Sequence, residues 1–193
     1  MFKDIMITKQ FTAIFLLSII AFVGITSVVP LLAIASASTD RNFVAHLSAA
    51  PGVDTRATGE AIFHLTADGT ALSYKLIVAD INGVFMAHIH YKDGSIILWL
   101  YPNPNEVGSS GQTACINVLS GGSPSACPGY IEGRFSGILA KGTLTAENLR
   151  PSDCAGCDGF TFPQLISAIE SGNAFVNVHT ALVPTGAIQG TIE

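Results

Sequence analysis

The chain has 193 residues, of which 12% are charged, and its formal net charge is −5 at pH 7. Lysine and arginine are few and form no run, so the sequence argues against recognition of nucleic acid or of anionic membranes by charge. Without its apolar N-terminal segment, the chain has the length of one domain built around one core.

The N-terminal segment has the features of an export signal. Two lysines precede an uncharged apolar run at residues 11–32, and Ala35 and Ala37 place small residues at the positions that a signal peptidase reads. This pattern predicts a signal peptide over residues 1–37 and a secreted or extracytoplasmic domain over residues 38–193. The alternative is an uncleaved membrane anchor, because residues 11–32 are long enough to span a bilayer.

Short alternating runs then predict an antiparallel meander. Turn sequences at 68–69, 82–83 and 93–94 separate segments in which apolar and polar residues alternate. The predicted strands are residues 42–48, 59–66, 71–78, 84–91 and 96–101. This spacing is typical of a β-sandwich or barrel.

Residues 102–132 interrupt the alternation and are rich in Gly, Ser, Pro and Asn, which predicts a surface insertion rather than a core element. In an exported protein, the four cysteines predict two disulfides. Pairing Cys115 with Cys127 and Cys154 with Cys157 is favoured because each bond closes a local loop, and the first would staple the insertion. The alternative for the Cys154-x-x-Cys157 pair is a redox dithiol or half of a zinc site.

The remaining sequence predicts further strands and one short helix. The strands are expected at residues 134–140, 173–180 and 187–192. The helix is expected at residues 162–171, where Thr161 caps it, Pro163 suits the first turn and Gly172 ends it. The predicted fold class is therefore mostly β, an antiparallel β-sandwich or barrel with one short helix.

Histidines supply the candidate chemistry. Alternation places His88 and His90 on one face of their strand. Two imidazoles at positions i and i+2 of a strand, together with a third from another part of the chain, can supply the ligands of a copper or zinc site. His179 lies in another β-prone run, whereas His46 and His64 stand alone on alternating strands.

The order of these motifs resembles the CHRD domain, the module named for its copies in chordin. The matching pieces are residues 59–61 with the turn at 68–69, the Ala87-His88-Ile89-His90 run, and residues 142–149, 171–180 and 184–190. The resemblance covers about residues 41–193, and the cysteine-bearing insertion departs from it. It implies an extracytoplasmic β-sandwich without an established enzymatic reaction: a non-catalytic binding or structural module whose partner would be a surface or envelope protein.

The family pattern also implies that His179 approaches His88 and His90. The hypothesis is a three-histidine site for copper or zinc storage or transfer, with a fourth position open or filled by His46 or His64. The alternative is that these imidazoles hydrogen-bond across strands or cap loop carbonyls. The arrangement is loosely similar to the copper/zinc superoxide dismutase sandwich. Copper-dependent redox activity is therefore the one enzymatic alternative. The sequence has no His/Asp-rich loop of the kind that supplies the further ligands of that enzyme.

Overall fold

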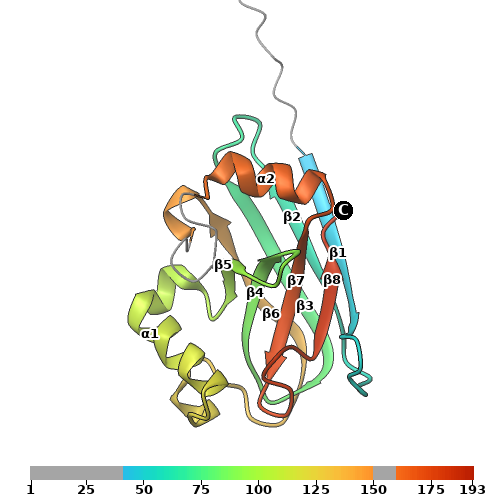
Figure 1. Cartoon of the computed structure of the whole chain (residues 1–193), viewed down its shortest axis with the longest axis vertical. Helices are drawn as coiled ribbons and strands as arrows, with labels where there is room; N and C mark the ends of the chain where they lie inside the picture. Colours follow the sequence, from blue (N-terminus) through green and yellow to red (C-terminus); the bar gives the residue numbers. More distant parts are fainter. Residues whose placement is uncertain (1–40, 150–159) are drawn as a thin grey trace, which may run out of the picture. The chain divides into compact units, whose positions relative to one another are not determined.

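A computed structural model of the chain describes residues 41–149 and 160–193. In this part of the chain, eight strands form one sheet in the order β5-β4-β7-β8-β1-β2-β3-β6 (Figure 1). Every neighbouring pair is antiparallel. The sheet curls into a nearly closed barrel or sandwich, which confirms the predicted mostly-β fold.

The elements follow the predicted order with small changes at their ends. The strands are β1 (Arg41–Ala49), β2 (Thr58–Leu65), β3 (Leu72–Asn82), β4 (Val84–Tyr91), β5 (Ile96–Tyr101), β6 (Arg134–Leu144), β7 (Ala174–Thr180) and β8 (Ile188–Thr191). The helices are α1 (Pro104–Leu119) and α2 (Phe162–Glu170), with single 3-10 turns η1 (Pro124–Ala126) and η2 (Ala146–Asn148). None of the helices in the described ranges is both long and apolar enough to cross a bilayer.

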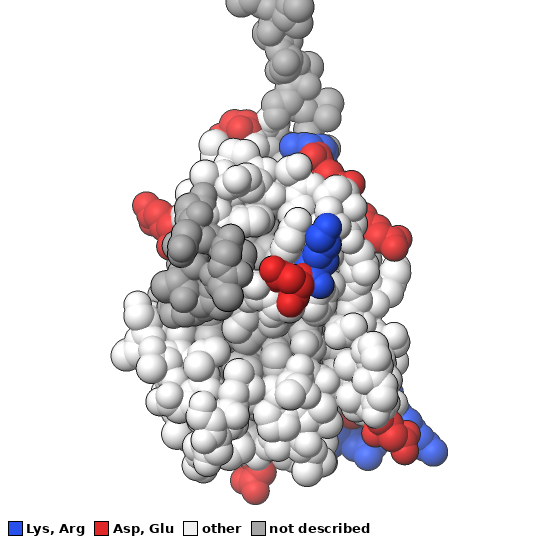
Figure 2. Space-filling view, in the orientation of Figure 1, with Lys and Arg blue, Asp and Glu red and all other residues white. Residues whose placement is uncertain are grey.

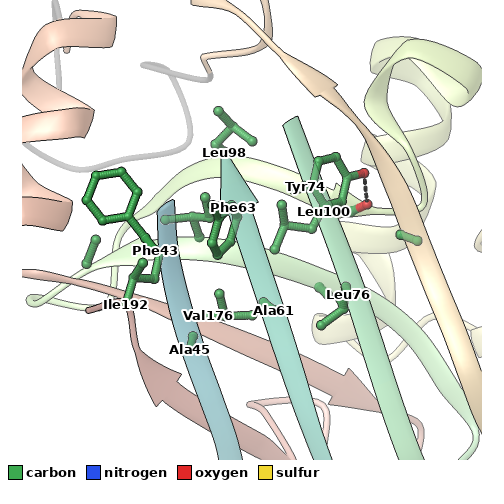
Figure 3. Close-up of a cluster of buried hydrophobic side chains, with 14 of the residues drawn as sticks. Phe43, Ala45, Ala61, Phe63, Tyr74, Leu76, Leu98, Leu100, Val176 and Ile192 are labelled. Carbon is green, nitrogen blue, oxygen red and sulfur yellow. Dashed lines mark hydrogen bonds between the residues drawn. The ribbon is translucent and has the colours of Figure 1, made fainter. Parts of the chain in front are cut away.

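The main core lies on the inner face of the curled sheet. Alternation buries every second residue of the strands, as Phe63 of β2 and Leu76 of β3 show (Figure 3). The Tyr74 hydroxyl enters this core and donates a 2.7 Å hydrogen bond to the Leu100 carbonyl, which satisfies its only donor. Helix α2 adds Leu165 and Ile169 to the same cluster.

Helix α2 confirms the single helix that the sequence predicts. The Thr161 side chain accepts from the Gln164 amide, and the Gln164 side chain accepts from the Thr161 amide, so a capping box fixes the first turn. Its apolar face is buried, and the chain turns sharply at Gly172, which has a φ of +67°.

The prediction for residues 102–132 is wrong in two respects. The segment contains a second helix, α1, and it contributes to a core. The Asn103 side chain caps α1. Gly108 interrupts the helix with non-helical φ and ψ angles, and this break explains why the sequence did not predict a helix in this segment. The buried Gln112, Cys115 and Val118 share one face at helical spacing.

Helix α1 closes a second core on the outer face of the sheet, which we call the outer core. Its members are Phe85, Met86, Trp99, Cys115, Val118 and Cys127. Cys115 and Cys127 form a disulfide, as predicted, and it joins α1 to the chain beyond η1. Residues 1–37 and the Cys154–Cys157 pair lie outside the described residues.

Charged side chains are sparse on the face drawn in Figure 2. The few Lys and Arg side chains there lie in small groups, each next to acidic side chains. On this face no basic patch forms, which agrees with the small charged fraction of the sequence.

Candidate metal centre

The three singled-out histidines come from the neighbouring strands β4 and β7. The register of this antiparallel pair sets Met86 opposite His179, His88 opposite Asn177 and His90 opposite Phe175. Opposite residues share a face of the sheet, so all six side chains leave the outer face. The structure thereby brings His179 to His88 and His90, across ninety residues of chain.

The ligand nitrogens of the three imidazoles lie within 4.8 Å of one another. His88 Nδ1 and His179 Nε2 form a 3.2 Å hydrogen bond. Two nitrogens bound at 2.0–2.1 Å to one tetrahedral ion are about 3.3 Å apart. These two nitrogens therefore already have the separation of two ligands on one metal.

Loop carbonyls fix the tautomers of two rings. His90 Nδ1 donates to the Gly94 carbonyl at 2.7 Å, and His179 Nδ1 donates to the Pro184 carbonyl at 2.8 Å. A carbonyl only accepts, so both rings carry hydrogen on Nδ1 and keep a lone pair on Nε2. Metal-bound histidines are oriented by the same kind of second bond.

The loop-carbonyl bonds are those that the structural alternative expects, yet they leave part of the cluster unexplained. His90 Nε2 is buried, and no protein atom in the described part of the chain forms a hydrogen bond with it. A buried polar atom in this state costs about 1–3 kcal/mol. A bound ion would remove that cost.

Burial favours the uncharged form of two of the rings, those of His90 and His179. Desolvation lowers the pKa of His179 to about 3, although its hydrogen bond to the Pro184 carbonyl opposes the change. Desolvation also lowers the pKa of His90, against the Gly94 carbonyl and the Asp93 carboxylate. Neutral imidazole is the form that binds metal, so protons compete weakly for this site.

Aromatic rings surround the cluster. The His88 ring meets Trp99 edge-on at a centroid distance of 4.2 Å, and the His90 ring stacks on Phe175 at 5.1 Å. Phe85 lies 6.4 Å from His179. Through Trp99 and Phe85, the histidines adjoin the outer core that α1 covers.

Sequence reasoning missed two polar neighbours of the cluster. Trp99 Nε1 and Asn177 Oδ1 are buried, and neither has a hydrogen-bond partner among the described residues. Asn177 is held by its amide, which donates to the Thr185 carbonyl at 3.2 Å. A Cβ at Gly186 would come within 2.2 Å of the Asn177 side chain, so glycine there is required by the close approach. Asn177 lies two residues before His179, so alternation alone could have placed it on this face.

The histidines considered for a fourth position lie elsewhere. His46 is exposed and its Nδ1 is 3.4 Å from Glu60, while His64 Nδ1 is 2.8 Å from Asn42 Oδ1. Within the described residues, the group that could hold an ion consists of His88, His90 and His179. Of the two alternatives for the fourth position, the described residues do not support filling by His46 or His64, and the position is open.

Comparison with known proteins agrees with the motifs. The model of the CHRD domain family matches residues 43–192, which is most of the chain and spans all three histidines. Neither the curated proteins nor the solved structures contain a match. On the strength of the family match, this chain belongs to the CHRD domain family.

Proposed function

We propose that this protein is an exported, non-catalytic CHRD module that binds one transition-metal ion, copper or zinc, through His88, His90 and His179. The observation that carries the proposal is the buried three-imidazole cluster, in which His90 keeps an unpartnered Nε2. Imidazole nitrogen is a good ligand for both metals.

The chemistry of the cluster favours metal binding over a purely structural role. A structural role uses the hydrogen bonds from Nδ1 of His90 and His179 to the Gly94 and Pro184 carbonyls, and the 3.2 Å hydrogen bond between His88 Nδ1 and His179 Nε2 across the strands. These bonds leave Nε2 of His90 without a partner among the described residues. An apolar side chain at this position would avoid the cost of burying a polar nitrogen. An ion would engage His90 Nε2 and so accounts for the part of the cluster that the hydrogen bonds do not.

Burial of the cluster supports storage, transfer or stabilisation rather than turnover. The exposed fractions of His88, His90 and His179 are 0%, 6% and 4%. A catalytic metal keeps an open position for water or substrate. An ion held by these buried rings would have little contact with a substrate, so we retain no enzymatic activity in the proposal.

Metal analysis of the native protein tests the proposal. The chain is expressed from its complete sequence in its own host, purified without chelator or affinity tag, and analysed by mass spectrometry of the elements. We expect close to one equivalent of copper or zinc, and its loss in His90→Gln and in His179→Gln. His46→Gln is the matched control, because His46 is an exposed histidine outside the cluster, and it should keep the metal.

Two results would contradict metal binding. One is a native protein without metal that also retains none after loading and dialysis. The other is a metal content that the two cluster variants share with the wild type. If those variants instead lower the free energy of unfolding at unchanged metal content, the histidines serve the fold alone.

A further inference from the structure

Met86 is a further candidate donor beside the three histidines. It is fully buried, and the β4–β7 register sets it directly opposite His179. Opposite residues of an antiparallel pair have Cβ atoms about 4.5–5.5 Å apart on the same face. Met86 also lies two residues before His88 on β4, so it shares that side of the strand with His88 as well.

An irregularity in β4 accounts for this placement. The register of β4 against β7 shifts between Val84 and Met86. Val84 packs in the main core, whereas Phe85 and Met86 both belong to the outer core. A bulge of this kind re-aims a side chain, and here it delivers a thioether to the face that carries the imidazoles.

The charge of the site restricts the ion that it suits. In the described part of the chain, the group of possible ligands contains histidines and no carboxylate. Imidazole rings and a thioether bring no negative charge to a region walled by Trp99 and Phe175. The Born cost of burying an ion grows with the square of its charge, so a divalent ion costs about four times as much as a monovalent one.

The softness of the donor atoms also favours a monovalent metal ion. Thioether sulfur is a soft ligand that selects Cu(I), and imidazole serves copper as well as zinc. We infer that the site takes Cu(I), bound by the three imidazoles and by the Met86 sulfur. This inference rests on the proposed function and narrows the choice of metal that it leaves open.

Competition titrations test the role of Met86. The full-length chain carries Cys154→Ser and Cys157→Ser, because a reduced Cys-x-x-Cys pair would itself bind Cu(I). It is titrated without oxygen with Cu(I) against bicinchoninate, and separately with Zn(II). Trp99 is the only tryptophan and lies 4.2 Å from His88, so its fluorescence reports occupancy.

We expect Cu(I) to bind one to one and to quench Trp99. The volume-conserving Met86→Leu should weaken Cu(I) binding at least tenfold, and should lower the preference for Cu(I) over Zn(II) by a similar factor. Val118→Ala is the matched control, since Val118 belongs to the outer core but offers no donor, and it should bind Cu(I) like the parent chain. In a sample labelled at the methionine methyls, the resonance missing from Met86→Leu should shift when Ag(I) is added as a redox-inert stand-in.

The outcomes separate the two proposals. Cu(I) affinity unchanged in Met86→Leu, with a methyl resonance that Ag(I) leaves in place, would overturn the role of Met86 while His90→Gln still tests the histidines. Tighter binding of Zn(II) than of Cu(I), after correction for the competitor, would overturn the assignment of the metal. Absence of binding for both ions would overturn this inference together with the proposed function.

Discussion

The two faces of strands β4 and β7 are equally buried and chemically opposite. The inner face is mainly apolar, with Ala87, Ile89, Val176 and Val178 in the main core, and the buried Thr180 follows on the same face of β7 by alternation. The outer face carries His88, His90, Asn177 and His179, and none of these is more than 6% exposed. Hydrophobic burial accounts for the inner face and opposes the outer one, since polar groups lose water when they are buried. Burial of the outer face therefore depends on the partners that its polar groups find.

The outer face also depends on the segment between β5 and β6. Strands β4 and β7 supply the histidines, whereas α1 and Cys127 supply the cover over Trp99 and its neighbours. The disulfide between Cys115 and Cys127 ties this cover together. This segment thus buries the part of the outer face around Trp99, which adjoins His88, and lowers the dielectric on that side of the cluster.

Replacing a histidine of the cluster by an apolar side chain of similar size is the most direct test of whether the two faces of β4 and β7 have different roles. We expect His179→Phe to weaken metal binding by at least a thousandfold, about 4 kcal/mol, because one ligand is gone. The metal-free variant should lose at most about 1–3 kcal/mol of unfolding free energy, since the apolar ring fills the site but leaves the Pro184 carbonyl without the His179 donor. Equilibrium unfolding and metal titration give the two quantities, and a strongly destabilised variant would contradict the distinction between the faces.

A truncation on the inner face should show the reverse behaviour. Ile89→Ala removes a fully buried side chain from the main core and should lower the free energy of unfolding by about 2–5 kcal/mol. Because Ile89 points away from the histidines, the folded variant should still bind one equivalent of metal with nearly unchanged affinity. Loss of metal from protein that circular dichroism shows to be folded would mean that the two faces are not independent.

Removing the disulfide that holds α1 over the outer core tests what residues 102–132 contribute to the outer face. Cys115→Ser combined with Cys127→Ser opens a loop whose ends are 12 residues apart, which should cost about 3 kcal/mol of stability. Loosening α1 should expose Trp99, seen as a red shift of its emission, and should speed metal release. Unchanged emission together with an unchanged release rate would show that the disulfide does not hold the cover in place.

Acidity should act mainly on the outer face. In the metal-free protein the pKa of His179 is about 3, below its ordinary value of 6.5, so the unfolded chain binds more protons between these values. Stability that is complete above pH 6.5 should therefore fall as the pH drops toward 3, by about 1.4 kcal/mol per pH unit for this one ring. His90 adds to the loss in the same direction.

The pH effect can be isolated by comparison with His179→Phe. Exposed carboxylates with lowered pKa values, such as Asp68 and Asp93, also lose stabilising interactions in acid, but they do so in both proteins. The wild type should lose stability more steeply between pH 6.5 and 4 in urea unfolding. Parallel curves for the two proteins would contradict a buried, neutral His179.

The sequence predicts which side chains share one face of a strand, but it does not predict which strands pair across long distances in the chain. Alternation places His88 and His90 together, and it places Met86 on the same side of the strand. The pairing of β4 with β7 joins segments ninety residues apart, and no local pattern encodes it, so the arrival of His179 followed only from the family pattern. Helix α1 was missed because Gly108 interrupts it, although the spacing of Cys115 and Val118 carried a helical signal.

X-ray absorption at the metal edge, on the Cu(I)-loaded full-length chain carrying Cys154→Ser and Cys157→Ser, tests the central claim most directly. The account predicts about three imidazole nitrogens near 2.0–2.1 Å and one sulfur near 2.3 Å, with the imidazole scattering reduced in His90→Gln. A first shell of nitrogen without sulfur would remove Met86 and leave the histidine site. A shell without imidazole scattering would contradict a metal centre on the outer face of β4 and β7.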